Sequence, residues 1–125
     1  MKDDIFTKEA PMAVGPYSQA IQMDKFLFCS GQIPIDPKTG EVLKGSIQEQ
    51  SHLVMKNVGA VLQAAGLTYD NIVKTTIFLS DMSYFQEMNA VYESYLAKPY
   101  PARSCVAVKE LPKQVDVEVE VLAVR

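Results

Sequence analysis

The sequence predicts an α+β domain in which two helices cover one face of a six-stranded sheet. Two stretches carry apolar residues at helical spacing, and six shorter stretches alternate in polarity or are rich in β-branched residues. They follow one another in the order β-β-β-α-β-α-β-β, which favours one sheet with both helices on the same face. With 125 residues, of which 48% are hydrophobic, the chain is expected to form a single domain over residues 1–125.

The first three predicted strands are short and precede the first helix. Ile5–Phe6 is the first candidate, and a loop with two prolines follows at residues 10–16. Ser18–Met23 and Phe26–Ser30 are then expected to form a hairpin that turns at Asp24-Lys25.

The first predicted helix has clear signals at both ends. A long loop precedes it, Gly31–Gly45, with a turn at Asp36–Gly40, and loops of this length are more often functional than idle. Ser46 and Glu49 form a capping box that satisfies the first free amides of the helix. Gly66 is expected to end it. The apolar residues at helical spacing between these signals are Ile47, Val54, Val58, Val61, Leu62 and Ala65.

A strand and a second helix are predicted next. Ile72–Leu79 is rich in β-branched residues, and Ser83–Gln86 is interpreted as a second capping box. Asn89 falls on the flank of the helix that follows, where its amide points either at the edge of a site or at water. The apolar face of this helix carries Phe85, Met88, Tyr92 and Leu96.

The last two predicted strands are expected to pair as a hairpin. Leu111–Gln114 contains a proline and is interpreted as their connection. Valines alternate with carboxylates along Val115–Val121, and Val106 and Val108 share one face of the strand before it. Both valine faces are expected to meet the core, because a slip of one residue would bury the carboxylates.

This pairing predicts a polar site on the other face of the hairpin. Arg103 and Cys105 would lie on the same side as Glu118 and Glu120, which brings together a cation, a thiol and candidates for a general base. Arg103 is the only arginine apart from Arg125, and its rigid fork of donors matches a carboxylate or a phosphate.

Simpler interpretations stay open for each of these polar residues. Alternating valine and glutamate is also the ordinary pattern of a half-exposed strand whose carboxylates lie in water, and this applies to Asp116 and Glu120 in particular. For Arg103 the simpler interpretation is a surface salt bridge, which contributes little to stability.

The sheet face opposite the helices needs cover of its own. Its predicted residues mix the apolar side chains of Ile72–Leu79 with Arg103, Cys105 and Glu118. A face of this kind is typical of a subunit interface with a pocket at its edge, so we expect a closed ring of subunits. These residues do not fix the number of subunits.

Composition excludes several classes of function. A net charge of −3 argues against binding nucleic acid through a basic patch, and no apolar run is long enough to span a bilayer. No apolar segment follows the first residues, so we expect a cytoplasmic protein. Cys29 and Cys105 are expected to be reduced thiols, and one histidine makes a zinc site improbable. Without a Gly-rich phosphate loop, the default is a protein with no cofactor and no metal.

The motifs along the chain resemble those of the RidA family of reactive intermediate deaminases, also called the YjgF type. The match covers nearly the whole chain, in order. The segments that carry it are Gly15-Pro16-Tyr17-Ser18-Gln19-Ala20, Ser30-Gly31-Gln32-Ile33-Pro34, Asp36-Pro37-Lys38-Thr39-Gly40, Asn57–Gly66, Val73-Lys74-Thr75-Thr76, Asn89-Ala90-Val91-Tyr92, Pro101-Ala102-Arg103-Ser104-Cys105 and Val117-Glu118-Val119-Glu120.

The resemblance implies a mixed six-stranded sheet of chorismate-mutase-like type, in a homotrimer whose sheets face inward. The family's pockets lie between adjacent subunits and bind small 2-keto and 2-imino acids. The implied reaction hydrolyses 2-iminobutanoate or 2-iminopropanoate, the products of pyridoxal-phosphate dehydratases acting on threonine and serine, to 2-keto acid and ammonia. This links the chain to damage control in branched-chain amino-acid metabolism, including isoleucine biosynthesis. The family uses no metal and no organic cofactor.

The resemblance also assigns roles to individual residues. Arg103 is similar to the family's carboxylate clamp and Glu118 to its water-activating group. The substrate-binding residues by the same resemblance are Tyr17, Ser30, Gly31, Asn89 and Cys105. Tyr17 has the alternative role of a packed loop anchor. Cys105 is interpreted as pocket lining, because no histidine stands beside it in the sequence to activate the thiol.

Two other functions compete with imine hydrolysis. The same pocket in a trimer would also suit a non-catalytic regulatory protein that senses a small ligand or docks on a partner. An endoribonuclease is the weakest alternative, because the chain is slightly acidic and has two arginines and no histidine pair.

Overall fold

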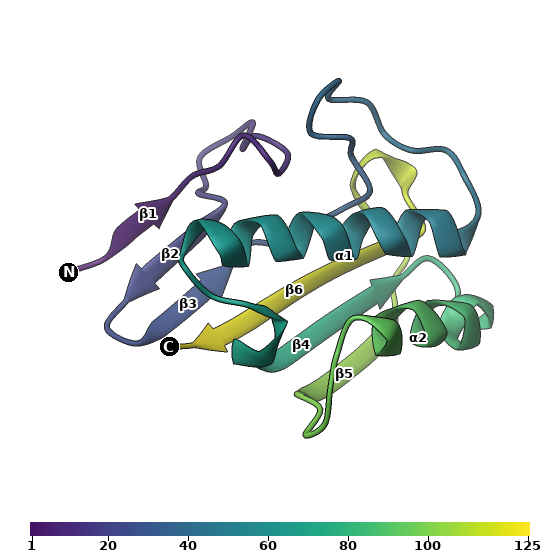
Figure 1. Ribbon diagram of the computed structural model, residues 1–125. Coiled ribbons are helices and arrows are strands. Elements are labelled where there is room, and N and C mark those ends of the chain that lie inside the picture. The colour runs from purple at the N-terminus through teal and green to yellow at the C-terminus, as the bar shows by residue number, and fades with distance from the viewer.

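Two helices lie across one face of a six-stranded sheet in the computed structural model, which describes residues 1–125 (Figure 1). The strands lie in the order β1-β2-β3-β6-β4-β5, and only β4 and β5 are parallel, so the sheet is mixed and the predicted α+β class is confirmed. The strands are β1 (Asp3–Ile5), β2 (Ala20–Met23), β3 (Phe26–Cys29), β4 (Ile72–Leu79), β5 (Ala102–Ala107) and β6 (Val117–Val124). The helices are α1 (Ile47–Ala64) and α2 (Phe85–Ser94).

Helix α1 begins and ends where its signals predict. The Glu49 N–H donates to Ser46 Oγ at 3.1 Å, and the Ser46 N–H donates to Glu49 Oε1 at 2.9 Å, which completes the capping box. Gly66 follows the helix with a φ of 76°, a backbone conformation that side chains disfavour. Neither this helix nor α2 combines the length and apolar character that crossing a bilayer would take.

Helix α2 begins differently from the prediction. Ser83 is not its cap; instead Asp81 Oδ1 accepts a hydrogen bond from the Ser83 N–H at 2.8 Å. That contact opens a 3₁₀ turn over Met82–Tyr84, and α2 continues from Phe85 without a side-chain cap of its own. The apolar face of α2 is confirmed at Met88 and Tyr92, which are buried; Val91 is buried as well, and Leu96 lies beyond the end of the helix.

The core lies between α1 and the two central strands. Strand β6 contributes alternate buried residues, and β4 contributes Ile77 and Leu79. Burial of this aliphatic surface is the main favourable term in the folding of a domain of this size. The apolar residues of α1 and β6 that are at most 4% exposed are Val54, Met55, Val58, Val61, Leu62, Val117, Val119, Val121 and Ala123.

The predicted hairpin between the last two strands is wrong. Strand β4 lies between β5 and β6, and β5 pairs with β4 in parallel, with Arg103 opposite Thr75 and Cys105 opposite Ile77. Residues paired across neighbouring strands point to the same face, so Arg103 and Cys105 lie on the side of the buried residues Thr75 and Ile77, which is the helix side.

The same rule puts Glu118 on the other face of the sheet. It pairs with Phe78, and the buried Val117 and Val119 on either side of it face the helices. The prediction failed because β5 is an edge strand whose valine does not meet the core. Val106 is 45% exposed on the face without helices.

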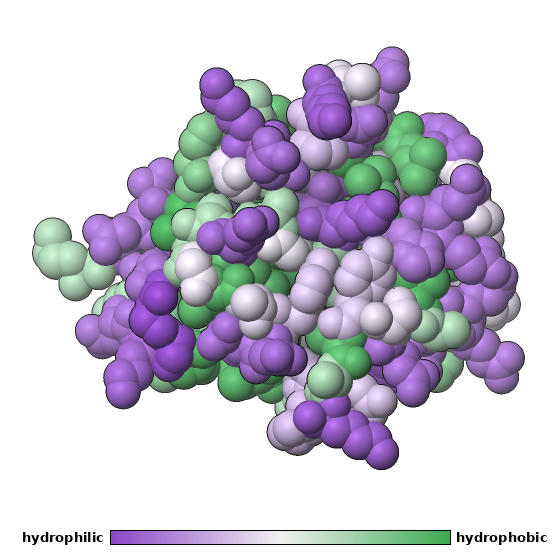
Figure 2. Space-filling model, in the orientation of Figure 1, coloured by the Kyte–Doolittle hydropathy of each residue, from purple (hydrophilic) through white to green (hydrophobic).

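That face of the sheet, which we call the open face, carries no helix. Met23, Phe26 and Phe28 are each about half exposed, and the rings of Phe26 and Phe28 stack with centroids 6.0 Å apart. The side that carries the helices shows hydrophilic residues interspersed with apolar patches (Figure 2). An uncovered, partly apolar sheet face is what the sequence predicts, and its use as a subunit interface stays a prediction.

Two buried amide side chains fasten the loops to this frame. Gln19 Oε1 accepts from the Thr7 N–H at 2.7 Å, and its Nε2 lies within 3.3 Å of the carbonyl oxygens of Thr7, Ala10 and Pro11. Asn57 Nδ2, on α1, donates to the carbonyl oxygens of Ile33 and Ile35 at 3.3 and 3.0 Å. Satisfying buried polar groups in this way holds the N-terminal loop against the start of β2 and the loop after β3 against α1.

Candidate functional site

A groove of about 870 Å³ brings together four of the seven residues that the sequence predicts for the site. It lies between the N-terminal loop, the loop after β3 and the start of β6. The four residues are Tyr17, Ser30, Gly31 and Glu118, and Glu120 also lines the groove.

An irregularity in strand pairing places the loop after β3 beside Glu118. Phe28 pairs with Leu122, but the next bridge joins Gln32 to Val119, so the three residues 29–31 stand opposite the two residues 120–121. The Gln32–Val119 bridge is held by backbone hydrogen bonds of 2.8 and 3.1 Å. One extra residue in a ladder bends the strand, and such bulges are common next to active sites.

The Glu118 carboxyl packs directly against the backbone of Gly31. A methyl group built on Gly31 would overlap Glu118 Oε2 and lie 2.9 Å from its Cδ, so only glycine fits there without a shift of the carboxylate. Burial raises the pKa of Glu118, and the nearby charge of Glu120 raises it further. The groove therefore contains a half-buried carboxyl that holds its proton more tightly than an ordinary glutamate.

Ser30 and Tyr17 line the groove, but their hydroxyl groups differ in the hydrogen bonds that they can still offer to a ligand. Ser30 Oγ donates to the Ser18 carbonyl at 2.6 Å, so it has only lone pairs left for a ligand. The Tyr17 hydroxyl accepts a long bond from the Val14 N–H at 3.4 Å, and 52% of the residue is exposed. Its own O–H remains available to donate to a ligand in the groove.

A second hollow, of about 440 Å³, holds Arg103 and Asn89. Arg103 Nη1 donates to Asn89 Oδ1 at 2.5 Å, and its guanidinium carbon lies 5.4 Å from the Phe85 ring centre and 5.2 Å from that of Tyr92. Guanidinium over aromatic faces is a stabilising arrangement that also limits the swing of the side chain. The lining residues are Asn89, Tyr92, Glu93, Tyr100, Pro101 and Arg103.

Cys105 lines neither the groove nor the hollow. It points to the helix side and packs against the core, with Ile77 as its partner on β4. Burial raises the pKa of its thiol, and the Arg103 charge only partly opposes this. Because the thiolate is the reactive form, this environment argues against a nucleophilic role. The predicted placement of this thiol beside the carboxylates is wrong.

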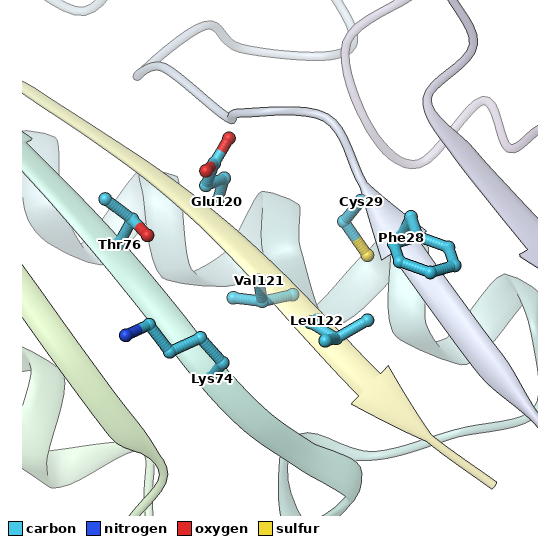
Figure 3. Close-up of a pocket in the computed structure, with 7 residues that line it drawn as sticks. All are labelled: Phe28, Cys29, Lys74, Thr76, Glu120, Val121 and Leu122. Atoms are coloured by element: carbon cyan, nitrogen blue, oxygen red, sulfur yellow. The ribbon is translucent and has the colours of Figure 1, made fainter.

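A third and smaller hollow, of about 290 Å³, lies on the open face between β3, β6 and β4 (Figure 3). It contains Lys74 and Glu120 on neighbouring strands, beside the apolar Phe28 and Leu122. Burial raises the pKa of Cys29, at its edge, to about 12, so this thiol is un-ionised at neutral pH. Glu120 lines both this hollow and the groove, so the two adjoin.

The predicted site is therefore split within one chain. Glu118 and its groove belong to the open-face side, while Arg103 and Asn89 lie on the helix side at the opposite edge strand. One chain does not bring the cation and the carboxyl together, contrary to the prediction from the hairpin.

Several polar residues that hold this frame are not among the predicted site residues. Asn57 stands among Val54, Val58 and Val61 on the buried face of α1, and a lone amide in an apolar stripe is the signal that would have found it. Asp116 does not lie free in water either. It accepts bonds from Gln50 Nε2 at 2.9 Å and from Ser80 Oγ at 2.7 Å.

Comparisons with known proteins agree on one family. The family model described as Endoribonuclease L-PSP matches residues 7–125. A RutC family protein of Pyrococcus horikoshii is 50% identical over 123 residues, covering 98% of each chain. A 2-iminobutanoate/2-iminopropanoate deaminase of Escherichia coli is 44% identical over 128 residues, covering 100% of this chain and 99% of that protein.

A solved structure shares both the fold and a substantial part of the sequence. The crystal structure of Escherichia coli TdcF with bound serine superposes with a TM-score of 0.92 at 43% identity, covering 98% of each chain. The architecture described above is thus that of experimentally determined relatives.

Proposed function

The chain belongs to the endoribonuclease L-PSP family, which is the RidA or YjgF family, and from this premise we propose that it hydrolyses small 2-imino acids in the cytoplasm. The substrates would be 2-iminobutanoate and 2-iminopropanoate, released when dehydratases act on threonine and serine, and the products would be the 2-keto acid and ammonia. The relative named as a deaminase for these compounds supports this choice, as does the relative solved with serine bound.

The observation that carries the proposal is the environment of Glu118. Its carboxyl is half buried in a groove, packed on a glycine, and has a raised pKa. A group of this kind exchanges protons closer to neutral pH than a solvated glutamate does, which suits a general acid and base.

The chemistry needs one anchor and one proton carrier. Arg103 would hold the substrate carboxylate through paired N–H donors and so fix the plane of the C=N bond. With the imine nitrogen protonated, Glu118 would accept a proton from water as the water oxygen attacks the C=N carbon, which gives a carbinolamine. Glu118 would then pass that proton to the nitrogen and take up the hydroxyl proton as the C–N bond breaks, so that ammonia leaves while the C=O bond of the keto acid forms.

Because Arg103 and Glu118 lie on opposite sides of one sheet, we propose that the working site forms between copies of the chain. Arg103 and Asn89 of one subunit would face Tyr17, Ser30, Gly31 and Glu118 of its neighbour in a homotrimer. The partly apolar open face supports such an assembly, because contiguous exposed apolar patches commonly mark the surfaces through which proteins associate.

The direct test generates 2-iminobutanoate in situ with an amino acid oxidase or a dehydratase and follows its loss by trapping. We expect the wild-type chain to accelerate the loss of the imine, and Arg103→Ala and Glu118→Ala each to remove about 100-fold or more of that acceleration. An unchanged rate in both variants would contradict the assigned roles.

A mixing experiment tests the sharing of the site. Arg103→Ala and Glu118→Ala chains, inactive alone, are unfolded together and refolded as a mixture. If each site takes Arg103 and Glu118 from different copies, about a quarter of the sites regain both groups and activity returns. If both groups act within one copy, the mixture stays inactive.

The competing functions give different results in the same assays. A regulatory protein would bind 2-oxobutanoate without accelerating hydrolysis. A ribonuclease would cleave RNA with a dependence on the same residues, but Glu118 and Glu120 at the groove would repel a phosphate backbone.

A further inference from the structure

Three side chains of helix α2 hold the guanidinium of Arg103, although Arg103 is an exposed residue. Asn89 Oδ1 accepts one N–H of Nη1, and the rings of Phe85 and Tyr92 lie within 5.4 Å of the guanidinium carbon. Asn89 lies one turn after Phe85, and Tyr92 follows three residues later, so all three project from one side of α2.

The Tyr92 ring is itself held in place by a hydrogen bond to strand β4. Tyr92 is only 5% exposed, and its hydroxyl lies 2.8 Å from Thr75 Oγ1, which is 1% exposed. Thr75 is the residue paired with Arg103 across β4 and β5. The ring that flanks the guanidinium is therefore tied to the strand that lies beside the arginine.

The acceptor at position 89 is neutral, and this matters for a site that binds an anion. A carboxylate there would orient the guanidinium equally well but would cancel most of its charge. Glu93, the one carboxylate that lines this hollow, accepts a 3.4 Å bond from the Tyr100 hydroxyl and has no hydrogen bond or ion pair with Arg103. The amide uses one N–H and leaves the others, with their charge, for a ligand.

We propose that Asn89 is a positioning residue: it holds one end of the Arg103 guanidinium with a neutral acceptor, so that an ordered cation, with no carboxylate of its own chain bound to it, meets the substrate carboxylate. This rests on the proposed function for the identity of the anion. It departs from the expectation that Asn89 binds the substrate itself.

Arginine side-chain NMR tests the positioning directly. The chain has two arginines, so it gives two Nε–H signals, and Arg125, held by the Ala65 carbonyl, is an internal control. We expect Asn89→Ala to lower the order parameter of the Arg103 signal, and Asn89→Asp to keep it, with Arg125 unchanged in both. An Arg103 signal as ordered in Asn89→Ala as in the wild type would overturn the proposal.

Steady-state kinetics separates order from charge. We expect Asn89→Ala to raise KM about tenfold with a smaller change in kcat, and Asn89→Asp to raise KM at least as much although Arg103 stays ordered. A wild-type KM in Asn89→Asp would show that the neutrality of the acceptor has no role. Gln86→Ala, one turn before Asn89 and lining a separate hollow between α1 and α2, is the matched control and is expected to match the wild type in both measurements.

The two proposals fail separately. If the wild-type chain does not accelerate imine hydrolysis, the proposed function is lost. The order parameters, and the affinity for 2-oxobutanoate in place of KM, still decide whether Asn89 positions Arg103.

Discussion

Glu118 and Arg103, the two charged side chains of the proposed reaction, are held in different ways. Glu118 packs on backbone: it lies half buried against Gly31, and no side chain donates a hydrogen bond to it. Arg103 is exposed to solvent and is held by side chains, namely one amide and two aromatic rings. The carboxyl thus loses water and gains a raised pKa, while the guanidinium keeps its water and gains orientation.

The difference teaches what each half of the site contributes. Desolvation tunes proton affinity, so the Glu118 side is suited to acid and base chemistry. Orientation without desolvation preserves charge, so the Arg103 side is suited to binding an anion in a fixed plane. Changes around Glu118 are therefore expected to alter the rate of hydrolysis and its pH dependence. Changes around Arg103 are expected to alter the affinity for the substrate.

Glu118→Gln is expected to have the largest effect. It keeps the shape but cannot take a proton, so kcat/KM is expected to fall about 100-fold or more. In the wild type, kcat/KM is expected to fall as pH drops through the raised pKa of Glu118, because the protonated carboxyl cannot accept a proton from water. A pH profile of both proteins checks this. The comparison breaks if the wild-type profile is flat, or if the variant keeps the same inflection.

Gly31→Ala is expected to have the second-largest effect, because the added methyl group displaces the Glu118 carboxyl. The new methyl group overlaps the carboxyl, which must move; because this carboxyl ends a flexible side chain, the free energy of unfolding is expected to fall only slightly. The rate of imine hydrolysis is expected to fall, while the midpoint of urea unfolding changes little. Gly66→Ala, after α1 and away from the groove, tests strain at a positive φ without touching Glu118. Loss of activity in that control would sink the explanation.

Arg103→Lys is expected to have a moderate effect that is confined to binding. The charge remains, but the planar fork and its contact with the two rings are lost, so KM is expected to rise about tenfold, or ~1.4 kcal/mol. The free energy of unfolding is expected to change little, because Arg103 is exposed. If kcat fell as much as in Glu118→Gln, the prediction that Arg103 acts only through substrate binding would be contradicted.

The smallest expected effect is on stability, and it has a definite sign. Glu118 has a higher pKa in the folded chain than when unfolded, so between those values the folded state binds more protons and stability falls as pH rises. Glutamine does not titrate. Glu118→Gln is therefore expected to be more stable than the wild type at pH 7, with the gain shrinking toward pH 4. Urea unfolding at both pH values checks this, and a gain that is larger at pH 4 would contradict it.

The elements of the fold could be predicted because their signals are local. The capping box of Ser46 and Glu49, and the β-branched run of Ile72–Leu79, each specify a structure through neighbours in sequence. Strand pairing is not local in this sense. The alternation in β5 fits either face, and only its parallel pairing with β4 decides that Arg103 points to the helices.

The same distinction between local signals and non-local contacts applies to the candidate site. Gly31 and Glu118 lie in segments that resemble the motifs of the family, and the structure brings these two residues into contact. The contact between Asn89 and Arg103 depends on how α2 is rotated over the edge strand, which no pattern in the sequence reports. Sequence periodicity placed Asn89 on a flank of the helix, and packing gave that flank its partner.

The side chain of Gln19 has a consequence for the beginning of the chain. β1 has three residues and one neighbouring strand, so most of what restrains the segment before Gly15 is this one amide and the small buried surface of Ala10. With so few contacts, this segment is expected to open as one unit. Residues 12–17, which form one wall of the groove, are continuous with it. Detachment would carry Tyr17 away while leaving the central strands intact, so local opening at this end, far below the free energy of global unfolding, is enough to dismantle the groove.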